Sequence, residues 1–211
     1  HKLSALEQMI NEQSAILTTL SQKLTKQRKN AIHLLKIELE QILTKMGMKD
    51  TLFKIELINS DKFLFNGMDQ LSFQFSANKG VDFKSLKKVA SGGELSRIML
   101  AIKTVLSRYK KLPTLVFDEI DSGVSGKISG NIAEVMANMS KKLQVFTITH
   151  LPQVAAKGDH HFKVEKSEQN GKFKTQLHLL NPETRINEIA KMLSKSEVTD
   201  TAIAHARELM N

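Results

Sequence analysis

The sequence contains no cysteine and no tryptophan, and only three of its 211 residues are proline. The absence of cysteine excludes disulfides and thiolate metal sites, which fits a reducing cytoplasm. No apolar run reaches the roughly 18 residues that a membrane-spanning helix needs. The first 30 residues are polar and periodic, so we expect no signal peptide and no membrane partner. The chain begins at His1 rather than at a methionine, and we expect it to be a fragment.

The chain is basic, with 31 lysines and arginines against 22 acidic residues and a net charge of +9. Such a balance permits contact with nucleic acid, although a basic soluble protein without that function fits the charge equally well. Hydrophobic residues make up 41% of the sequence, which is enough for a core. The length corresponds to one domain, or to one domain with an appendage.

Residues 1–47 carry a heptad pattern with no proline or glycine before Gly47. We expect a coiled-coil helix that needs a second arm strand, or a long helix packed on its own domain. After Leu34 the frame slips, which indicates a stutter or docking onto a globular body. Two glutamines weaken the seam, whose positions are Leu3, Leu6, Ile10, Gln13, Leu17, Leu20, Leu24, Gln27, Ala31 and Leu34.

Residues 48–211 have a different character. Apolar residues alternate with polar ones in "LFKIEL" and "LSFQFS", which predicts two strands with a turn at Asn66-Gly67 between them. From Val89 onward, helical periods alternate with two short apolar strands, "TLVF" and "QVFTI", which we expect to be buried in a parallel sheet. A hairpin with its turn at Asn170-Gly171 and a last helical stretch complete the chain. The fold class is therefore α/β with a long N-terminal helix.

The stretch "ASGGELSR" places Ser91, Gly92, Gly93 and Glu94 at the start of a helical pattern. Ser91 and Glu94 satisfy a capping box, and a simple helix cap is one interpretation. Two glycines exceed what a cap needs, and they let a ligand or another backbone approach closely. The free N–H groups of a helix start favour an anion, so the stretch is also a candidate phosphate contact.

Asp118 and Glu119 follow the strand "TLVF", and His150 follows the strand "QVFTIT". In parallel sheets, ligands bind at the carboxyl ends of strands. Asp118 suits Mg²⁺, Glu119 suits a base that orients water, and His150 can donate to a phosphate oxygen. Two acids at a helix start and a structural histidine are the alternative interpretation.

Two other patterns do not support a site. Gly123–Lys127 has two residues between its glycines instead of the four of a phosphate loop, and Ile128 follows where Ser or Thr is required. Asp159-His160-His161 lacks a suitably spaced fourth ligand, so we expect a loop that enters a strand rather than a metal site.

The ordered set "SGGELSR", "TLVFDEID", "SGVSG" and "TITH" resembles the signature motif, Walker B strand, D-loop and switch histidine of an ATP-binding-cassette head. A heptad arm that enters this half resembles the SMC group of these ATPases. Within that group, residues 53–210 are most similar to a family of bacterial DNA-repair proteins, for example in "KVASGGELSRIMLAIK" and "THLPQVAAKGDHHFKVEK". Lys79 stands where that family more often has proline.

The resemblance implies a coiled-coil arm at 1–47 and the C-terminal lobe of an ABC ATPase head at 48–211. It implies ATP and Mg²⁺ as cofactors, with Asp118 as a mainly indirect Mg²⁺ ligand, Glu119 as the base and His150 as a further catalytic residue on the molecule's own nucleotide. The nucleotide of a partner head would be contacted by Ser91, Gly92, Gly93 and Glu94, with Asp121, Ser122 and Gly123 as the D-loop. The phosphate loop would lie on an N-terminal lobe outside this sequence.

The function implied by the resemblance is ATP-dependent pairing of two identical heads and ATP hydrolysis, coupled to holding DNA in double-strand-break repair and recombination. The expected place is the bacterial cytoplasm, at the nucleoid. The alternative is an SMC-type structural DNA tether in which ATP only gates assembly. A transporter cassette fits less well, because such cassettes carry no heptad arm within the head.

Overall fold

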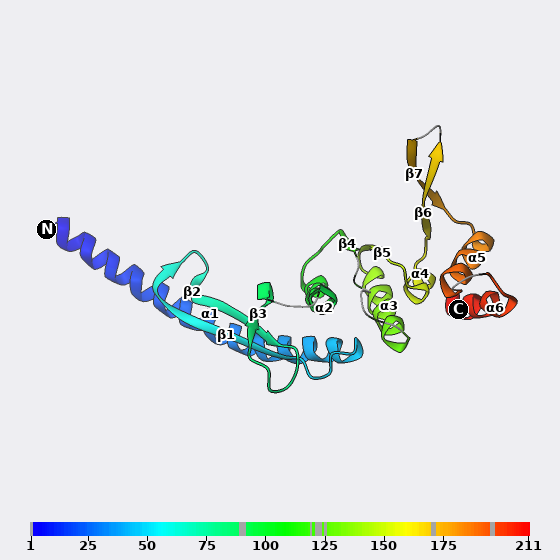
Figure 1. Ribbon diagram of the computed structural model, residues 1–211. Coiled ribbons are helices and arrows are strands. Elements are labelled where there is room, and N and C mark those ends of the chain that lie inside the picture. Colours follow the sequence, from blue (N-terminus) through cyan, green and yellow to red (C-terminus); the bar gives the residue numbers. More distant parts are fainter. Residues whose placement is uncertain are drawn as a thin grey trace. The chain divides into compact units, whose positions relative to one another are not determined.

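The computed structural model describes residues 2–88, 92–118, 120, 124, 126–169, 172–194 and 197–211. They fall into two compact units, His1–Leu95 and Ser96–Asn211. Among the described residues, no helix has both the length and the hydropathy that a membrane crossing requires. Figure 1 shows the order of the elements along the chain.

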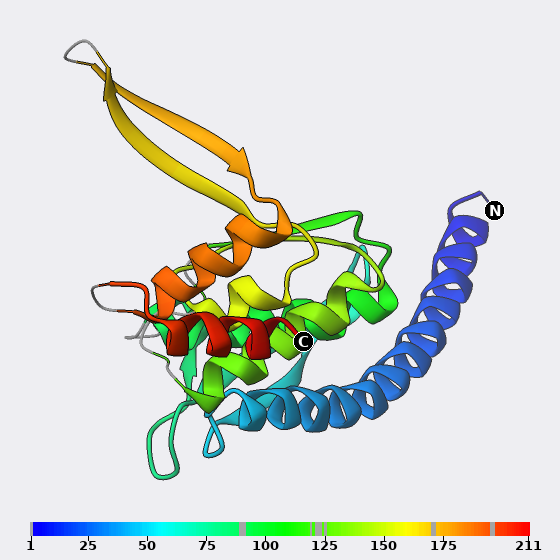
Figure 2. The same cartoon turned by 90° about the vertical axis from the view of Figure 1, so that its right-hand side faces the viewer.

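The first unit begins with the helix α1 (Lys2–Lys45), which confirms the long helix predicted from the heptads. The helix curves gently along its length (Figure 2), as long helices do when one side packs. It ends where Gly47 adopts a φ of 81°, and the Met48 N–H donates to the Leu43 carbonyl over 2.9 Å. A glycine with positive φ is the usual stop of a helix, because it carries no Cβ to clash.

The two halves of α1 have different environments. In the N-terminal half, the seam residues Leu3, Ile10 and Leu17 are exposed by 72%, 66% and 46%. In the C-terminal half, Leu39 and Leu43 are fully buried. The helix already contacts the hairpin at Thr25 and Arg28. After the frame slip at Leu34, its apolar residues Leu39 and Leu43 are buried in its own unit. The structure confirms packing on its own unit for the C-terminal half of the helix, and the coiled-coil interpretation of the N-terminal half stays a prediction.

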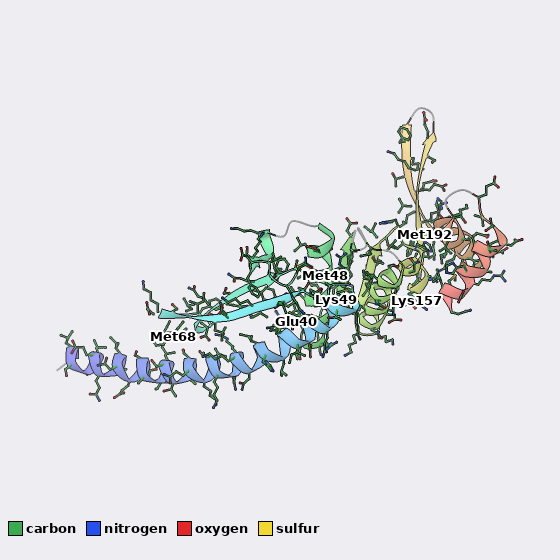
Figure 3. All side chains as sticks on the ribbon, turned by 60° about the horizontal axis from the view of Figure 1, so that its bottom comes forward. Glu40, Met48, Lys49, Met68, Lys157 and Met192 are labelled. Carbon is green, nitrogen blue, oxygen red and sulfur yellow. The ribbon has the colours of Figure 1, made fainter. Side chains whose placement is uncertain are left out.

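The helix packs on an antiparallel hairpin formed by β1 (Leu52–Leu64) and β2 (Gly67–Ser76), as predicted. The short β3 (Lys84–Ser85) pairs with β2, and the 3-10 helix η1 (Leu86–Lys88) follows it. Phe53 is buried, and its ring centroid lies 5.4 Å from that of Phe73. The Phe53 N–H donates over 3.2 Å to the carboxylate of Glu40 on α1, which is labelled in Figure 3. The alternation of apolar residues thus supplies the face on which α1 rests.

The helix α2 (Gly92–Tyr109) leads into the second unit. There β4 (Thr114–Asp118) and β5 (Gln144–Ile148) form a parallel pair, joined by the crossover helix α3 (Lys127–Ser140). The predicted parallel sheet is confirmed for this pair, because an α-helical crossover returns the chain in the same direction.

The prediction that β4 and β5 are buried strands was wrong for one of their two faces. Phe117 is buried, but Val116, Phe146 and Ile148 are exposed by 65%, 46% and 61%. These side chains alternate along the strands, so one face packs and the other is exposed. The apolar composition of both strands nevertheless indicates a sheet with two covered faces.

After β5 come α4 (Pro152–Lys157), then an antiparallel hairpin of β6 (Phe162–Gln169) and β7 (Lys172–Leu179), as predicted. The final helices are α5 (Pro182–Leu193) and α6 (Asp200–Met210). Pro182 begins α5 after the cap Asn181, whose side chain accepts from the Thr184 N–H over 2.9 Å. The three helices α4, α5 and α6 meet in a small core of Ala156, Ile189, Ala190 and Ala206.

Candidate nucleotide site and arm junction

The end of the parallel pair brings together two residues predicted for the site. Asp118, the last residue of β4, pairs in register with Ile148, the last residue of β5. His150 follows two residues later, so Asp118 and His150 lie at the same carboxyl edge, and both are exposed. The Leu151 N–H donates to the Thr149 hydroxyl over 3.0 Å, which fixes the turn between β5 and α4. An acid and a histidine at one open edge can together contact one phosphorylated ligand.

The glycine-rich stretch forms the first turn of α2. Gly92 and Gly93 open the helix, and Glu94 lies in its first turn. Gly92 is exposed, and no described atom lies within 4 Å of the position that a Cβ would take there. Another backbone or a ligand can therefore approach this helix start closely. Free N–H groups and the helix dipole make such a start favourable for an anion.

Five predicted site residues lie outside the described residues: Ser91, Glu119, Asp121, Ser122 and Gly123. Asp118, Gly92, Gly93, Glu94 and His150 are described. The capping-box interpretation depends on Ser91, and the role of the general base depends on Glu119, so both stay predictions.

Of the two other sequence patterns, the one at Gly123–Lys127 lies partly outside the described residues, so its interpretation stays a prediction. In the described part of the chain, no group of three or more His, Asp or Glu side chains gathers as a metal cluster would. Asp159, His160 and His161 lead directly into β6, as expected. Burial and the nearby Arg185 lower the pKa of His161, while Glu188 opposes them. This histidine is therefore neutral at pH 7, which suits a packed residue at the base of the hairpin.

Arg185 was not predicted to matter, yet it holds the end of α4. Its Nη2 atom donates to the carbonyl oxygens of Ala155, Ala156 and Gly158, at 3.2 and 2.9 Å for the first two. The last carbonyls of a helix lack partners within it, and a cation there also meets the negative end of the helix dipole. Because α4 begins two residues after His150, Arg185 helps to fix the segment that follows the site.

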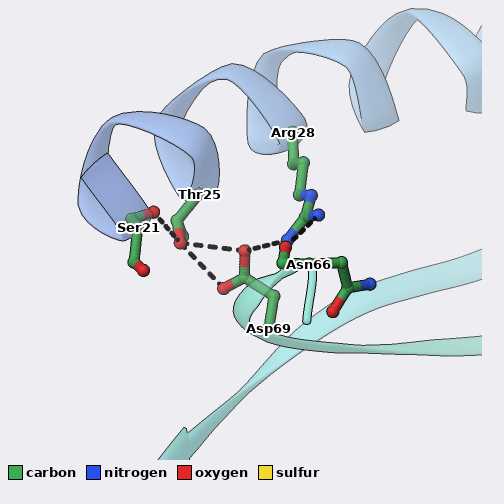
Figure 4. A network of polar contacts seen from close by, with 5 residues as sticks. All are labelled: Ser21, Thr25, Arg28, Asn66 and Asp69. Carbon is green, nitrogen blue, oxygen red and sulfur yellow. Dashed lines mark hydrogen bonds and ion pairs between the residues drawn. The ribbon is translucent and has the colours of Figure 1, made fainter. Parts of the chain in front are cut away.

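A second polar cluster, also absent from the sequence predictions, joins α1 to the β1–β2 hairpin (Figure 4). Asp69 of β2 is buried, and its carboxylate accepts from Arg28 Nη1 over 2.9 Å. The Thr25 hydroxyl lies 2.8 and 2.9 Å from the two carboxylate oxygens. Arg28 Nη2 also donates to the Asn66 carbonyl over 2.7 Å. The arm is thus fixed to the hairpin turn by several hydrogen bonds.

Glycine is required at this junction. Gly67 has a φ of 110°, and a Cβ there would lie 3.2 Å from Leu24 Cδ2 of α1. The predicted Asn66-Gly67 turn therefore serves two purposes, because it reverses the chain and lets the helix approach closely. From sequence alone, only the turn could be predicted, since the contact joins residues about 40 positions apart.

Structural comparison finds the same fold in SMC heads. The Smc head domain of Pyrococcus yayanosii, with a coiled coil and joint, aligns with a TM-score of 0.61 and 20% identity, over 90% of this chain and 36% of that one. The Smc head domain of Pyrococcus furiosus, with an extended coiled coil and bound to the C-terminal domain of ScpA, aligns with a TM-score of 0.58 and 21% identity, over 90% and 46%. At such identities the likeness concerns the fold, which is that of an SMC ATPase head.

Sequence comparison gives closer relatives. The chain is 37% identical over 214 residues to the DNA repair protein RecN of Halalkalibacterium halodurans, across 100% of this chain and 38% of that protein. It is 36% identical over 208 residues to RecN of Haemophilus influenzae, across 98% and 36%. To RecN of Bacillus subtilis it is 40% identical over 184 residues, across 82% and 32%.

No family model matches the chain. The RecN proteins match it at 36–40% identity, and the first two named above match almost its whole length. The chain spans less than two fifths of the length of these curated relatives. With the fold and the sequence in agreement, the chain belongs to the RecN family of DNA repair proteins and corresponds to their C-terminal part.

Proposed function

We propose that the chain forms one part of an ATP-hydrolysing head that closes on a second, identical head and thereby holds DNA during double-strand-break repair and recombination. The observation that carries this proposal is the shared edge of β4 and β5, where Asp118 and His150 lie together. The relatives that support the assignment to DNA repair are the RecN proteins.

The site residues divide between two nucleotides. Asp118, Glu119 and His150 act on the nucleotide bound to their own molecule, with Glu119 as the base that orients the attacking water. Ser91, Gly92, Gly93 and Glu94 contact the nucleotide bound to the partner head. The open space above Gly92 supports this second role, because a partner's phosphate needs close access to the helix start. The D-loop residues Asp121, Ser122 and Gly123 complete the contact.

The described residues fit ATP with Mg²⁺. Asp118 offers a hard oxygen ligand at an exposed strand end, and Mg²⁺ in phosphate sites keeps several waters and needs only one or two carboxylates. The described part of the site holds no cluster of protein ligands, which agrees with the preference of Mg²⁺ for few carboxylates and several waters. Bound Mg²⁺ would neutralise charge on the phosphates, while His150 would donate to a phosphate oxygen.

The 211 residues contain no G-x-x-x-x-G-K-[ST] sequence, so the phosphate loop must come from another part of the protein. We assign residues 1–47 to the arm and residues 48–211 to the C-terminal lobe of the head. The exposed apolar side chains Val116, Phe146 and Ile148 support a missing N-terminal lobe, because a sheet face of this kind needs a cover. We place the protein in the cytoplasm, at the nucleoid.

Turnover by the full-length protein with and without Glu119→Gln tests the proposal. The substitution keeps the shape of the side chain and removes the base, so ATP binds, the heads close and hydrolysis stops. DNA capture and release that are equal with and without this substitution, although the variant releases no phosphate, would show that ATP only gates assembly. In that case the protein is a structural DNA tether rather than an enzyme that uses hydrolysis. Phosphate release by the variant at the wild-type rate would instead show that Glu119 is not the base.

A further inference from the structure

A cavity of about 450 Å³ lies between α1 and the β1–β2 hairpin. From the helix it is lined by Gln22, Lys26, Lys29 and Asn30, and from the hairpin by Asn59 and by Met68, which is labelled in Figure 3. The hydroxyls of Thr18, Ser21 and Thr25 complete the wall. No carboxylate lines the cavity among the residues given by the structure.

The polarity of this helix face is unusual for its position. A helix that packs on a sheet normally presents an apolar stripe to it, as α1 does at Leu39 and Leu43. Between residues 18 and 30, the side that lines the cavity carries hydroxyls, amides and two ammonium groups instead. The two ammonium groups of Lys26 and Lys29 and the amide groups of Gln22, Asn30 and Asn59 can each donate to an anion. The Thr18 and Thr25 hydroxyls, in contrast, already bond to other groups of the protein.

The charge of the cavity is not cancelled by Asp69. This buried carboxylate is bonded to Arg28 and Thr25 and also interacts with the charge of Lys29, so one negative charge stands against more than one cation of α1. Within residues 2–88, neither Lys26 nor Lys29 forms an ion pair with a carboxylate at salt-bridge distance. The arm junction therefore has an excess of positive charge.

The lining also discriminates among anions. No aromatic side chain lines the cavity in the described structure, so it offers no surface on which a base could stack. Its residues can contact the sugar-phosphate backbone through charge and hydrogen bonds, which is how proteins hold nucleic acid without reading its sequence. We propose that this cavity is a binding site for backbone phosphates of duplex DNA, with Lys26 and Lys29 as the charged contacts.

This inference deepens the proposed function and rests on it only for the choice of DNA as the partner. The test uses the 211-residue chain and a fluorescent DNA duplex, without ATP, so it does not depend on hydrolysis. Binding is measured by anisotropy at several salt concentrations for the wild type, for Lys26→Gln/Lys29→Gln, and for a control, Lys110→Gln/Lys111→Gln. The control removes the same charge from exposed positions elsewhere.

We expect the cavity variant to bind about tenfold more weakly for each lysine at about 0.1 M salt, and its log–log salt slope to fall by about 2. The control should keep nearly the wild-type affinity, and Lys26→Arg/Lys29→Arg should restore binding because the charge returns. Equal losses in the cavity variant and the control would overturn the site, since they would report net charge alone.

A footprint on the unmodified chain avoids any effect of substitution on folding. Bound duplex should protect Lys26 and Lys29 from acetylation and leave Lys110 and Lys111 reactive. Protection by inorganic phosphate or ATP with none by DNA would overturn the proposal in favour of a small-anion site. A wild-type chain that binds no duplex would also overturn it, and the ATPase proposal would stand untouched.

Discussion

The guanidinium of Arg28 lies 2.9 Å from the carboxylate of Asp69, and this contact joins the arm helix to the hairpin turn. The side chain of Asp69 is 2% exposed, whereas that of Arg28 is 27% exposed. Removal of the Arg28 side chain and removal of the Asp69 charge should therefore have different effects on stability. A buried carboxylate without its cation has no access to water, while a half-buried guanidinium can turn towards it.

We expect Arg28→Ala to lower the free energy of unfolding by about 3 kcal/mol and Asp69→Asn by about 1–2 kcal/mol. Urea unfolding followed by circular dichroism measures both, and the double variant completes a cycle with a coupling of about 1–2 kcal/mol. Lys36→Ala on the same helix is the control, because its pair with Glu40 is long at 3.9 Å and partly exposed. A larger loss for Asp69→Asn than for Arg28→Ala would contradict the burial argument.

The same carboxylate makes stability depend on pH. Burial raises the pKa of Asp69, but hydrogen bonds from Arg28 and Thr25 and the charges of Arg28 and Lys29 together outweigh it, so the pKa falls below its ordinary 3.8. A lowered pKa means that the stabilisation is complete above the pKa of the unfolded chain and is lost as the pH falls through that of the folded chain. Below about pH 4, melting temperatures of the wild type should fall more steeply than those of Asp69→Asn. Parallel curves for the two proteins would show that Asp69 is not the group that titrates.

The purified 211-residue chain should not hydrolyse ATP at a useful rate. Without a phosphate loop and its lysine, most contacts to the β- and γ-phosphates are missing. Magnesium-dependent phosphate release is the measurement, with Glu119→Gln as the background. Activity of the wild-type chain above this background would mean that its site is more complete than the sequence predicts.

The exposed seam of α1 should find a substitute partner. Leu3, Leu6, Ile10, Leu17 and Leu20 are exposed by 46–72%, and an antiparallel arm strand would cover them. At millimolar concentrations we expect chains to pair through this seam, and Leu6→Lys/Ile10→Lys to keep them apart. Light scattering over a range of concentrations gives the mass. Phe65→Lys is the control, because this hairpin residue is fully exposed and lies outside the seam; a wild-type chain that stays monomeric would contradict the prediction.

The sequence predicted the elements whose signals are local. The period of α1, the alternation in β1 and β2, and the helix–strand order from α2 to β5 are each carried by neighbouring residues, and the structure confirms them. The placement of Asp118 and His150 at one edge of the sheet could also be predicted from the sequence, because neighbouring parallel strands have their carboxyl ends on the same side. Most of the site residues followed from the helix start and the strand ends, whereas the D-loop residues Asp121, Ser122 and Gly123 and the division of roles between two heads came only from the resemblance to the family.

The contacts that were missed join residues far apart in the chain. Thr25 and Arg28 lie about 40 positions from Asp69 in the sequence, and Arg185 lies about 30 positions from the α4 carbonyls that it contacts. In the sequence these residues look like ordinary polar surface residues, so no local pattern predicts that they contact one another. The exposure of Val116 and Ile148 was missed for a related reason. An apolar strand is predicted to be buried, but the element that packs on it can come from another segment of the protein.

The two groups of site residues should separate genetically in the full-length protein. Ser91→Arg places a bulky cation where a partner's γ-phosphate must approach, so it should spare nucleotide binding to the mutant's own phosphate loop and abolish head closure. A variant of the phosphate-loop lysine should lose its own nucleotide and keep an intact signature helix. Each variant should be inactive alone.

Mixing these two variants tests whether the signature helix acts on the partner's nucleotide. A mixed dimer contains one site with both lesions and one site with neither, because the clean site combines the phosphate loop of the Ser91→Arg chain with the signature helix of the lysine variant. ATPase activity should partly return if one intact site can fire alone. If mixed dimers form and stay inactive, either the two sites are coupled or Ser91, Gly92 and Gly93 do not act in trans. A mixture of Ser91→Arg with Glu119→Gln decides between these two explanations when it restores activity. Glu119 acts on the nucleotide of its own phosphate loop, so this mixed dimer also contains one site without a lesion.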